Sequence, residues 1–261
     1  MSSEKIKGLI ARGEKIAMLT CYDATFAKLS EAAGVDVLLV GDSLGMVLQG
    51  SENTLAVTMQ DMEYHTKSVA AGTTNCCIMT DMPAGSYEHS KEAALFNAKK
   101  LMSSGADIIK IEGGGEMVQT AQYLIEHGIP ICAHLGFTPQ SVKQLGGYRI
   151  QGKTDESADA ILQDAIAMDN IGVRFVLLEM VPAALAKAVT ETIKTPTIGI
   201  GAGVACDAQV LVWSDLMGLA EKPPKLAKVY RNLRREISEG VNEWARDVAT
   251  GAFPGPEQSF Q

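Results

Sequence analysis

The sequence lacks the features that mark several classes of protein. No run of about 18 apolar residues occurs among its 261 residues, so no transmembrane helix is expected. Residues 1–15 are charged and contain no apolar stretch of the kind found in signal peptides. Basic residues number 23 against 31 acidic ones, and the resulting formal net charge of −8 does not favour nucleic acids or anionic membranes as partners. These absences predict a cytoplasmic protein that acts on small molecules.

The cysteines and histidines do not indicate a metal site or a disulfide framework, and the common nucleotide-binding motifs are absent. The five cysteines form no C-x-x-C pair, so we expect reduced and buried thiols. The four histidines are too few and too scattered for a His-rich metal tract. Neither G-x-G-x-x-G nor G-x-x-x-x-G-K-[ST] is present, which argues against a nucleotide cofactor. The glycine-rich stretch at residues 199–203 fits an anionic ligand site, although tight turns and close packing explain it as well.

Short apolar runs alternate with segments of helical period along the chain. Eight runs are mostly rich in Val, Ile and Leu without alternation, which is typical of strands buried on both faces. They cover residues 17–23, 36–43, 76–83, 108–113, 130–136, 175–182, 197–203 and 209–214. Amphipathic helices are expected at residues 23–33, 58–71, 90–103, 116–127 and 155–170. Glycines that are typical of helix C-termini occur at Gly34, Gly72, Gly105, Gly128 and Gly172.

The repeated alternation of strand and helix predicts the fold class. It favours a parallel sheet, and eight units in 261 residues favour a closed (β/α)₈ TIM barrel over an open doubly wound sheet. We found no linker that would divide the chain. We therefore expect an α/β protein with a single catalytic domain over residues 1–261 and an extra C-terminal helix at residues 226–248.

The ends of the predicted strands are unusually acidic. The charged residues at these ends are Asp23, Asp42, Asp81, Lys110, Glu112, His134 and Glu179. Catalytic residues of (β/α)₈ barrels lie at the C-terminal ends of the strands, so these side chains are expected to converge on one mouth. A lone acid such as Asp23 or Asp42 is often only the N-cap of the next helix. A group of buried carboxylates, however, repels itself unless a metal cation or a substrate relieves the repulsion.

The type of these residues suggests which metal they would bind. Oxygen ligands without a paired His or Cys suit a hard ion, so we expect Mg²⁺ or another divalent cation. Asp42 and Asp81 are the predicted direct ligands. Glu112 is expected either to bind the ion directly or to hold a water on it.

The string of strand ends resembles the ketopantoate hydroxymethyltransferase family. The matching segments are TCYD (20–23), VGDSLGM (40–46), DMP (81–83), KIEGG (110–114), HLGFTPQS (134–141), GGYRIQG (146–152), LEMVP (178–182) and GIGAG (199–203). Each segment is short, but together they run in family order from about residue 3 to the C-terminus, which makes the resemblance specific.

This resemblance implies an activity and roles for individual residues. It implies transfer of a hydroxymethyl group from 5,10-methylenetetrahydrofolate to 3-methyl-2-oxobutanoate through a metal-stabilised enolate, the first step of pantothenate biosynthesis. It also implies a homo-oligomer, often a decamer. The implied metal ligands are Asp42, Asp81 and Glu112, the substrate contacts are Asp42, Ser43, Asp81, Lys110 and His134, and the catalytic base is Glu179.

Two departures and two alternatives accompany the resemblance. Ala208 replaces a glycine of the family pattern, and Ala84 replaces a common aromatic residue. If the glycine of the family has a positive φ, the alanine of this chain implies a different turn at position 208.

The enzymatic alternative is a metal-dependent 2-oxo acid lyase of the phosphoenolpyruvate mutase and isocitrate lyase type, which usually carries a cysteine-bearing loop that we do not find. The non-enzymatic alternative is a degenerate barrel kept as a scaffold, which the presence of all the proposed catalytic and metal-binding residues disfavours.

Overall fold

A computed structural model describes residues 2–260 of the chain. The chain divides into two compact units, Met1–Leu211 and Val212–Gln261. The first unit contains all the strands described below, and the described part of the second contains only helical segments and their connections. None of the described helices is both long and apolar enough to span a membrane.

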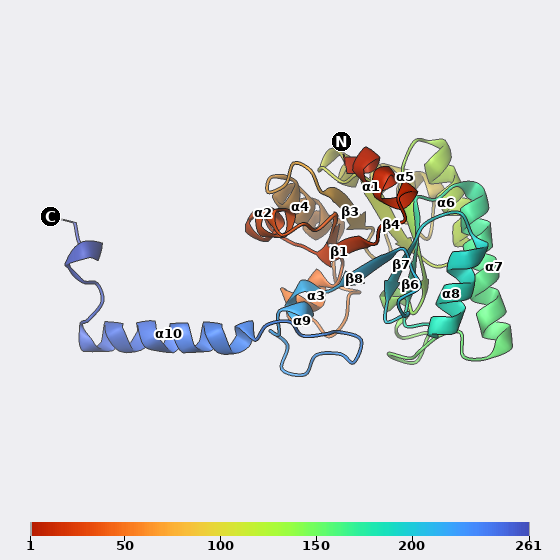
Figure 1. The fold of residues 1–261 in the computed structure, drawn as a ribbon. Coiled ribbons are helices and arrows are strands. Elements are labelled where there is room, and N and C mark those ends of the chain that lie inside the picture. Colours follow the sequence, from red (N-terminus) through yellow and green to blue (C-terminus); the bar gives the residue numbers. More distant parts are fainter. Residues whose placement is uncertain (1, 261) are drawn as a thin grey trace. The chain divides into compact units, whose positions relative to one another are not determined.

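Eight parallel strands form a closed barrel in the first unit (Figure 1). They pair in chain order, and the last strand pairs with the first. Their bounds are β1 Ile16–Thr20, β2 Val37–Val40, β3 Cys77–Asp81, β4 Ile108–Glu112, β5 Ile131–Gly136, β6 Phe175–Glu179, β7 Thr197–Ile200 and β8 Ala208–Leu211. The eight predicted strands and the (β/α)₈ barrel are thus confirmed, and most of the strands end a few residues earlier than expected.

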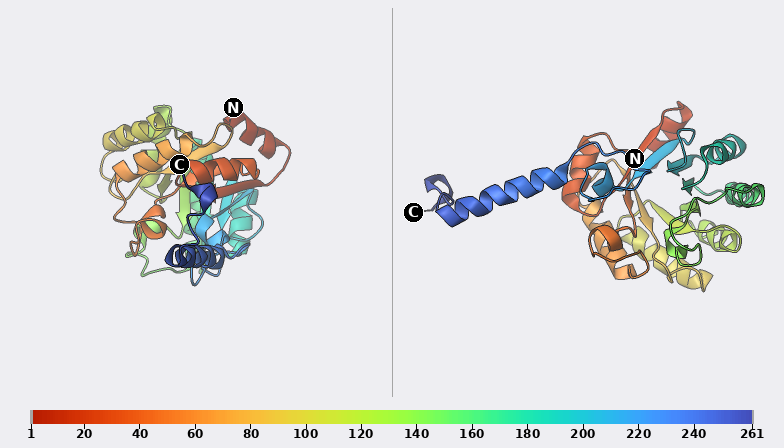
Figure 2. Two further views of the ribbon diagram at one scale, coloured as in Figure 1. Left: turned by 90° about the vertical axis from the view of Figure 1, so that its left-hand side faces the viewer. Right: turned by 90° about the horizontal axis from the view of Figure 1, so that it is seen from below.

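Helices surround the strands on the outside of the barrel, as the right-hand view of Figure 2 shows. The chain begins with α1 Ser2–Ala11; the helices after β1 to β6 are α2 Ala24–Ala32, α3 Leu44–Val47, α4 Met59–Ala70, α5 Lys91–Ser103, α6 Met117–Glu126, α7 Asp155–Ile171 and α8 Ala183–Thr192. Residues 201–207, which connect β7 to β8, form an irregular segment without a helix. Seven residues are too few for a helix with a connection at each end.

Side chains at the helix N-termini explain where several helices begin. Asp23 Oδ1 accepts a hydrogen bond of 2.9 Å from the Phe26 N–H and caps α2, and Thr58 and Asp61 form a capping box on α4.

Four of the five glycines predicted at helix C-termini have positive φ, the exception being Gly72. At Gly72 a Cβ would lie 2.2 Å from the Ala24 carbonyl oxygen, so close packing requires this glycine.

The barrel interior is packed with apolar side chains. The cluster draws alternate residues from the strands, such as Ile16 and Met18 of β1 and Phe175 and Leu177 of β6. The five cysteines are buried and free, as predicted. Because the interior is filled, polar chemistry has room only at the ends of the barrel.

Ala208, the departure from the glycine pattern, lies in regular strand structure. It is the first residue of β8, it is buried, and it does not have a positive φ. The alanine therefore needs no changed turn at this position.

The second unit is short and has one long helix. α9 Trp213–Leu216 is followed by α10 Leu233–Thr250 and by the single turn η2 Pro256–Gln258. The predicted late helix begins seven residues later than expected, at Leu233, because Asn232 accepts a hydrogen bond from the Arg235 N–H and caps it. None of the residues of α10 is buried.

Gly114 and Asp164 make a close contact that holds the loop after β4. A Cβ at Gly114 would lie 2.0 Å from Asp164 Cγ, and Asp164 Oδ1 accepts a hydrogen bond of 2.8 Å from the Gly115 N–H. We expect Gly114→Ala to lower the free energy of unfolding by about 1–3 kcal/mol, because Asp164 must move and lose this bond. In an Asp164→Ala background the same change should cost less than about 0.5 kcal/mol. Urea denaturation of the four proteins checks this, and an equal cost in both backgrounds would contradict it.

Candidate active site

The alternation of side chains along the strands brings the predicted site residues together. Residues 77 and 79 of β3, 108 of β4, 132 of β5, and 175 and 177 of β6 belong to the interior core. Continuing each series in steps of two leads to Asp81, Lys110 with Glu112, His134 and Glu179. These five side chains therefore form the interior layers at the C-terminal end of the barrel. Asp42 joins them from the loop after β2.

Three carboxyl groups are buried side by side in this end of the barrel. Asp42, Asp81 and Glu112 are 3%, 2% and 6% exposed, respectively. The Asp42 N–H donates a hydrogen bond of 3.0 Å to Asp81 Oδ2. A buried carboxylate is stable only when charges or hydrogen bonds compensate for the lost water. The compensation here comes mainly from one ammonium group.

Lys110 supplies the positive charge at the centre of the cluster. Its Nζ lies 3.0 Å from Asp81 Oδ1 and 3.9 Å from Glu112 Oε1, and the side chain is 4% exposed. Burial acts to lower the pKa of Lys110, but the charges of Asp81, Glu112 and Asp42 outweigh it and raise this pKa. Lys110 therefore stays a cation in the site.

The carboxyl groups respond unequally to their surroundings. Burial, together with repulsion from Asp81 and Glu112, raises the pKa of Asp42 well above its usual value. Burial also raises the pKa of Asp81, against the opposing effect of Lys110. Burial alone would raise the pKa of Glu112, but the hydrogen bond and charge of His134 and the charge of Lys110 lower it. Asp42 and Asp81 are thus the two carboxyls whose ionised forms are least well stabilised.

His134 lies between two glutamates. Its Nδ1 is 3.2 Å from Glu112 Oε1, and its Nε2 is 3.2 Å from Glu179 Oε2. Burial and the charge of Lys110 act to lower the pKa of His134, but hydrogen bonds with both glutamates raise it to about 9. The Lys110 Nζ also lies 3.2 Å from Nδ1, a contact that is a hydrogen bond only when this nitrogen carries no proton. A protonated ring instead donates toward Glu112.

The backbone around Glu179 is held in an unusual conformation. The next residue, Met180, has a φ of 48°, the only positive φ of a non-glycine among residues 2–260. Such a conformation costs about 1–3 kcal/mol and persists only where the surroundings impose it. The Phe137 N–H donates 2.8 Å to the Glu179 carbonyl, and a Cβ at Gly136 would lie 2.5 Å from the same oxygen. The side chain of Glu179 keeps 14% exposure, so it remains accessible from the mouth.

Ser43 lies beside the carboxylates and points to a tyrosine. Its Oγ is 2.9 Å from the Tyr22 hydroxyl. A Cβ at Gly41 would lie 2.9 Å from this Oγ and 3.5 Å from Asp81 Oδ2, so both groups border the same small space. Of the charged strand-end residues, only Asp23 serves as a helix cap away from this cluster.

Two residues at the site were missed from the sequence. Gln140, in η1 Pro139–Ser141, donates from Nε2 to Asp42 Oδ2 at 2.8 Å, and its N–H donates to Glu112 Oε2 at 2.9 Å. Tyr87, in the loop after β3, donates its hydroxyl to Gln140 Oε1 at 2.7 Å. Gln140 lies in the HLGFTPQS segment, which gave some signal, whereas no pattern around Tyr87 marks it.

The donor set fits a hard divalent cation without forming a closed cage. Among residues 2–260, no group of three or more His, Cys, Asp or Glu side chains converges closely enough to enclose a metal ion. Mg²⁺ does not require such a cage, because it usually takes one or two carboxylates and fills its other positions with water or substrate. Asp81 Oδ1 and Glu112 Oε1 are buried outside regular hydrogen-bond geometry, and their polar neighbours are the charged groups of Lys110 and, for Glu112, of His134. Two buried carboxylate oxygens left in this way favour a cation as their partner.

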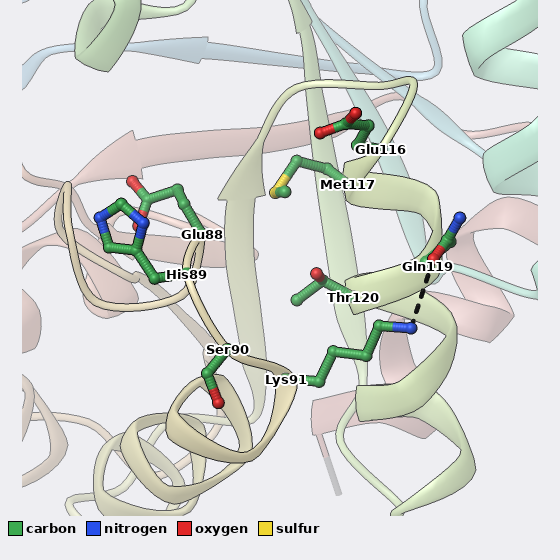
Figure 3. A pocket seen from close by; sticks show the side chains of 8 residues that line it. All are labelled: Glu88, His89, Ser90, Lys91, Glu116, Met117, Gln119 and Thr120. Atoms are coloured by element: carbon green, nitrogen blue, oxygen red, sulfur yellow. Dashed lines mark hydrogen bonds between the residues drawn. The ribbon is translucent and has the colours of Figure 1, made fainter.

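A surface pocket lies near this site but does not contain it. It is formed by the loop before α5 and the start of α6, with Glu88, Lys91, Glu116 and Gln119 among its lining residues (Figure 3). Lys91 Nζ donates to Gln119 Oε1 at 3.4 Å across it. No predicted site residue lines this pocket.

The glycine-rich turn after β7 packs closely against a neighbouring helix. Gly201 and Gly203 have positive φ, and a Cβ at Gly203 would lie 2.6 Å from the Cβ of Ala183 at the start of α8. These contacts favour the explanation of residues 199–203 by tight turns and packing.

Several solved structures have a similar fold. A phosphonopyruvate hydrolase crystallised with oxalate and Mg²⁺ matches 99% of this chain and 93% of its own, with a TM-score of 0.66 and 11% identity. A 2,3-dimethylmalate lyase of the phosphoenolpyruvate mutase and isocitrate lyase superfamily matches 100% of this chain and 91% of its own, with a TM-score of 0.63 and 14% identity. At these identities the likeness shows the fold alone.

Proteins that are related in sequence are much more similar to this chain than these solved structures are. The 3-methyl-2-oxobutanoate hydroxymethyltransferase of Nitrosospira multiformis is 54% identical over 249 residues, 95% of each chain. That of Thiobacillus denitrificans is 52% identical over 255 residues, 98% of this chain and 97% of its own. The family model described as ketopantoate hydroxymethyltransferase matches residues 1–256. The chain therefore belongs to the ketopantoate hydroxymethyltransferase family.

Proposed function

We propose that this chain transfers a hydroxymethyl group from 5,10-methylenetetrahydrofolate to 3-methyl-2-oxobutanoate, which gives 2-dehydropantoate, in the first step of pantothenate biosynthesis. The observation that carries the proposal is the convergence of Asp42, Asp81, Lys110 and Glu179 at one end of the barrel in a member of this family. The relatives named above carry the same activity in their names.

Asp42 and Asp81 are the proposed ligands of a Mg²⁺ ion, with Glu112 beside it. The support is their burial, the raised pKa of both aspartates and the buried oxygens of Asp81 and Glu112 that lie beside cationic groups outside regular hydrogen-bond geometry. When bound, Mg²⁺ would supply a Lewis acid that polarises the 2-oxo group of the substrate. Another divalent cation of similar hardness would serve in the same way.

The remaining residues have separate proposed roles. Glu179 takes the proton from C3 of the substrate, and His134, 3.2 Å from its Oε2, orients this carboxylate. Lys110 balances the substrate carboxylate or the negative charge that develops on the enolate oxygen. Ser43, with Asp42, Asp81 and His134, is proposed to contact the substrate. The nucleophilic C3 then forms a bond to the one-carbon unit of the folate. The two bonds of this unit to folate nitrogens are broken and its hydroxyl oxygen comes from water, so the reaction consumes one water and releases tetrahydrofolate.

The lyase alternative is disfavoured by the state of the cysteines. All five are buried. Burial raises the pKa of Cys21 to about 11 and that of Cys77 and Cys132 to about 12. A thiol with so high a pKa is neither a good acid nor a ready nucleophile at neutral pH.

The activity and its metal dependence can be tested together. We expect purified protein to form 2-dehydropantoate from 3-methyl-2-oxobutanoate, 5,10-methylenetetrahydrofolate and Mg²⁺, and to lose this activity after treatment with EDTA, because the polarising cation is gone. Mass spectrometry of the product measures this, and restored Mg²⁺ should restore the product. Product formation at an undiminished rate in metal-free protein would refute the metal site, and no product from folded, metal-loaded protein would refute the function.

Glu179→Gln tests the proposed base. The variant should lose exchange of the C3 hydrogen of 3-methyl-2-oxobutanoate in D₂O by about 10²-fold or more, because an amide cannot take the proton. Its melting temperature should still rise with Mg²⁺, as the proposed ligands are untouched. Glu191→Gln, on the exposed face of α8, is the matched control and should exchange like the wild type. Exchange that persists in Glu179→Gln would show that another group is the base.

We also propose that the chain forms a homo-oligomer in which α10 lies at a contact between copies. Ile237, Val241, Trp244 and Val248 recur at helical spacing on α10 and are between 47% and 56% exposed. Four large apolar side chains in one stripe are typical of a surface that another chain covers. The decamer implied by the family resemblance remains one possible size.

Light scattering coupled to size-exclusion chromatography tests the oligomer. We expect a mass that is a multiple of the 27.8 kDa chain. A Val241→Glu and Trp244→Glu double variant should have a smaller mass, because it places charges in the apolar contact. A wild-type protein that elutes as a monomer would overturn the proposal.

A further inference from the structure

Gln140 connects two of the proposed metal ligands through hydrogen bonds. Its Nε2 donates to Asp42 Oδ2 at 2.8 Å and to the Met82 carbonyl at 2.9 Å. Its backbone N–H donates to Glu112 Oε2 at 2.9 Å. Its Oε1 accepts from the Tyr87 hydroxyl at 2.7 Å. One residue of a short loop helix thus contacts groups in the loops after β2 and β3 and at the end of β4.

The direction of these bonds is fixed by groups that can act in only one way. The Glu112 backbone N–H can only donate, and it donates to the Tyr87 oxygen at 3.0 Å. The Tyr87 hydroxyl hydrogen is then free to point at Gln140, which favours the amide oxygen as the atom that faces it. The Met82 carbonyl can only accept, so the amide nitrogen faces this carbonyl and Asp42. The buried Tyr87 and the Met82 carbonyl together therefore set the orientation of the Gln140 amide.

The chemistry of an amide suits a place beside a cation site. A lysine or arginine here would also donate to Asp42, but its charge would repel a divalent cation bound by the same carboxylate. The Gln140 amide orients the carboxylate without adding charge. Groups that hydrogen-bond to metal ligands in this way orient the ligands and tune the affinity for the ion.

We propose that Gln140 is a positioning residue, which holds the carboxylates of Asp42 and Glu112 in a fixed relative orientation for one divalent cation, with Tyr87 and the Met82 carbonyl fixing the direction of its amide. This inference rests on the metal site of the proposed function. It assigns a role to a residue that contacts the ligands and does not itself bind the ion.

Gln140→Met tests the inference, since methionine keeps the length of the side chain and removes both polar atoms. Calorimetric titration of the full chain with MgCl₂ should show a dissociation constant about 10- to 100-fold higher than that of the wild type. At saturating Mg²⁺ the kcat for 2-dehydropantoate formation should return to within about threefold of the wild type, because the lost interaction affects the occupancy of the site. A variant that is merely misfolded would not recover with Mg²⁺.

Two further variants separate positioning from stability. Tyr87→Phe removes only the hydroxyl, so Gln140 Oε1 loses its donor and the Glu112 N–H loses its acceptor. The support of Gln140 is weakened, and the dissociation constant for Mg²⁺ should rise by about threefold or more. Thr195→Val removes the Thr195 hydroxyl bond to Asp169 Oδ1 (2.7 Å), before β7 and therefore at the other end of the barrel. It should lower the melting temperature and leave the dissociation constant within about twofold of the wild type.

The outcomes distinguish this inference from the function on which it rests. If the wild type gives no heat and no thermal shift with Mg²⁺, the metal site fails and the role of Gln140 fails with it. If the wild type binds Mg²⁺ and Gln140→Met binds it equally well, the role of Gln140 is wrong and the metal site stands. Weaker binding in Gln140→Met and Tyr87→Phe but not in Thr195→Val supports the inference.

Discussion

The structure depends on burying several carboxyl groups around a single lysine ammonium. Asp42, Asp81 and Glu112 are nearly inaccessible, and Lys110 lies 3.0 Å from one of them and 3.9 Å from another. Buried charges of one sign repel strongly where water cannot screen them, and removing one partner from such a group is costly. Lys110 is therefore a structural requirement of the cluster as well as a proposed catalytic group.

The register of the barrel places these charges against one another. Asp81 is the register partner of Lys110 between β3 and β4, and Glu112 is that of His134 between β4 and β5. Side chains alternate between the interior and the helices, so a slip of one residue in a strand would move its charged group to the outer face. The packed core below holds the register and so also holds the charges in contact.

The strands could be predicted from the sequence because most are continuous apolar runs, whereas the roles of individual acids could not. Asp23 and Asp42 look alike in the sequence, since each follows an apolar run and precedes a helix. In the structure Asp23 caps α2, while Asp42 is buried beside Asp81. The contacts of Gln140 and Tyr87 were beyond prediction, because they bring together loops that are 53 residues apart and meet only when the barrel closes.

The balance of charge explains why neutral polar groups surround the cluster. Among the ion pairs of residues 2–260, the four carboxyls of Asp42, Asp81, Glu112 and Glu179 are matched by one ammonium and one imidazole, so a fully ionised site is negative. Under the proposed function the substrate is itself an anion, and it would be repelled unless a divalent cation entered before it or with it. Additional fixed cations would also attract the substrate, but they would compete with the divalent ion for the same carboxylates. A neutral donor such as Gln140 orients a ligand without this competition, which is the physical reason for an amide at that position.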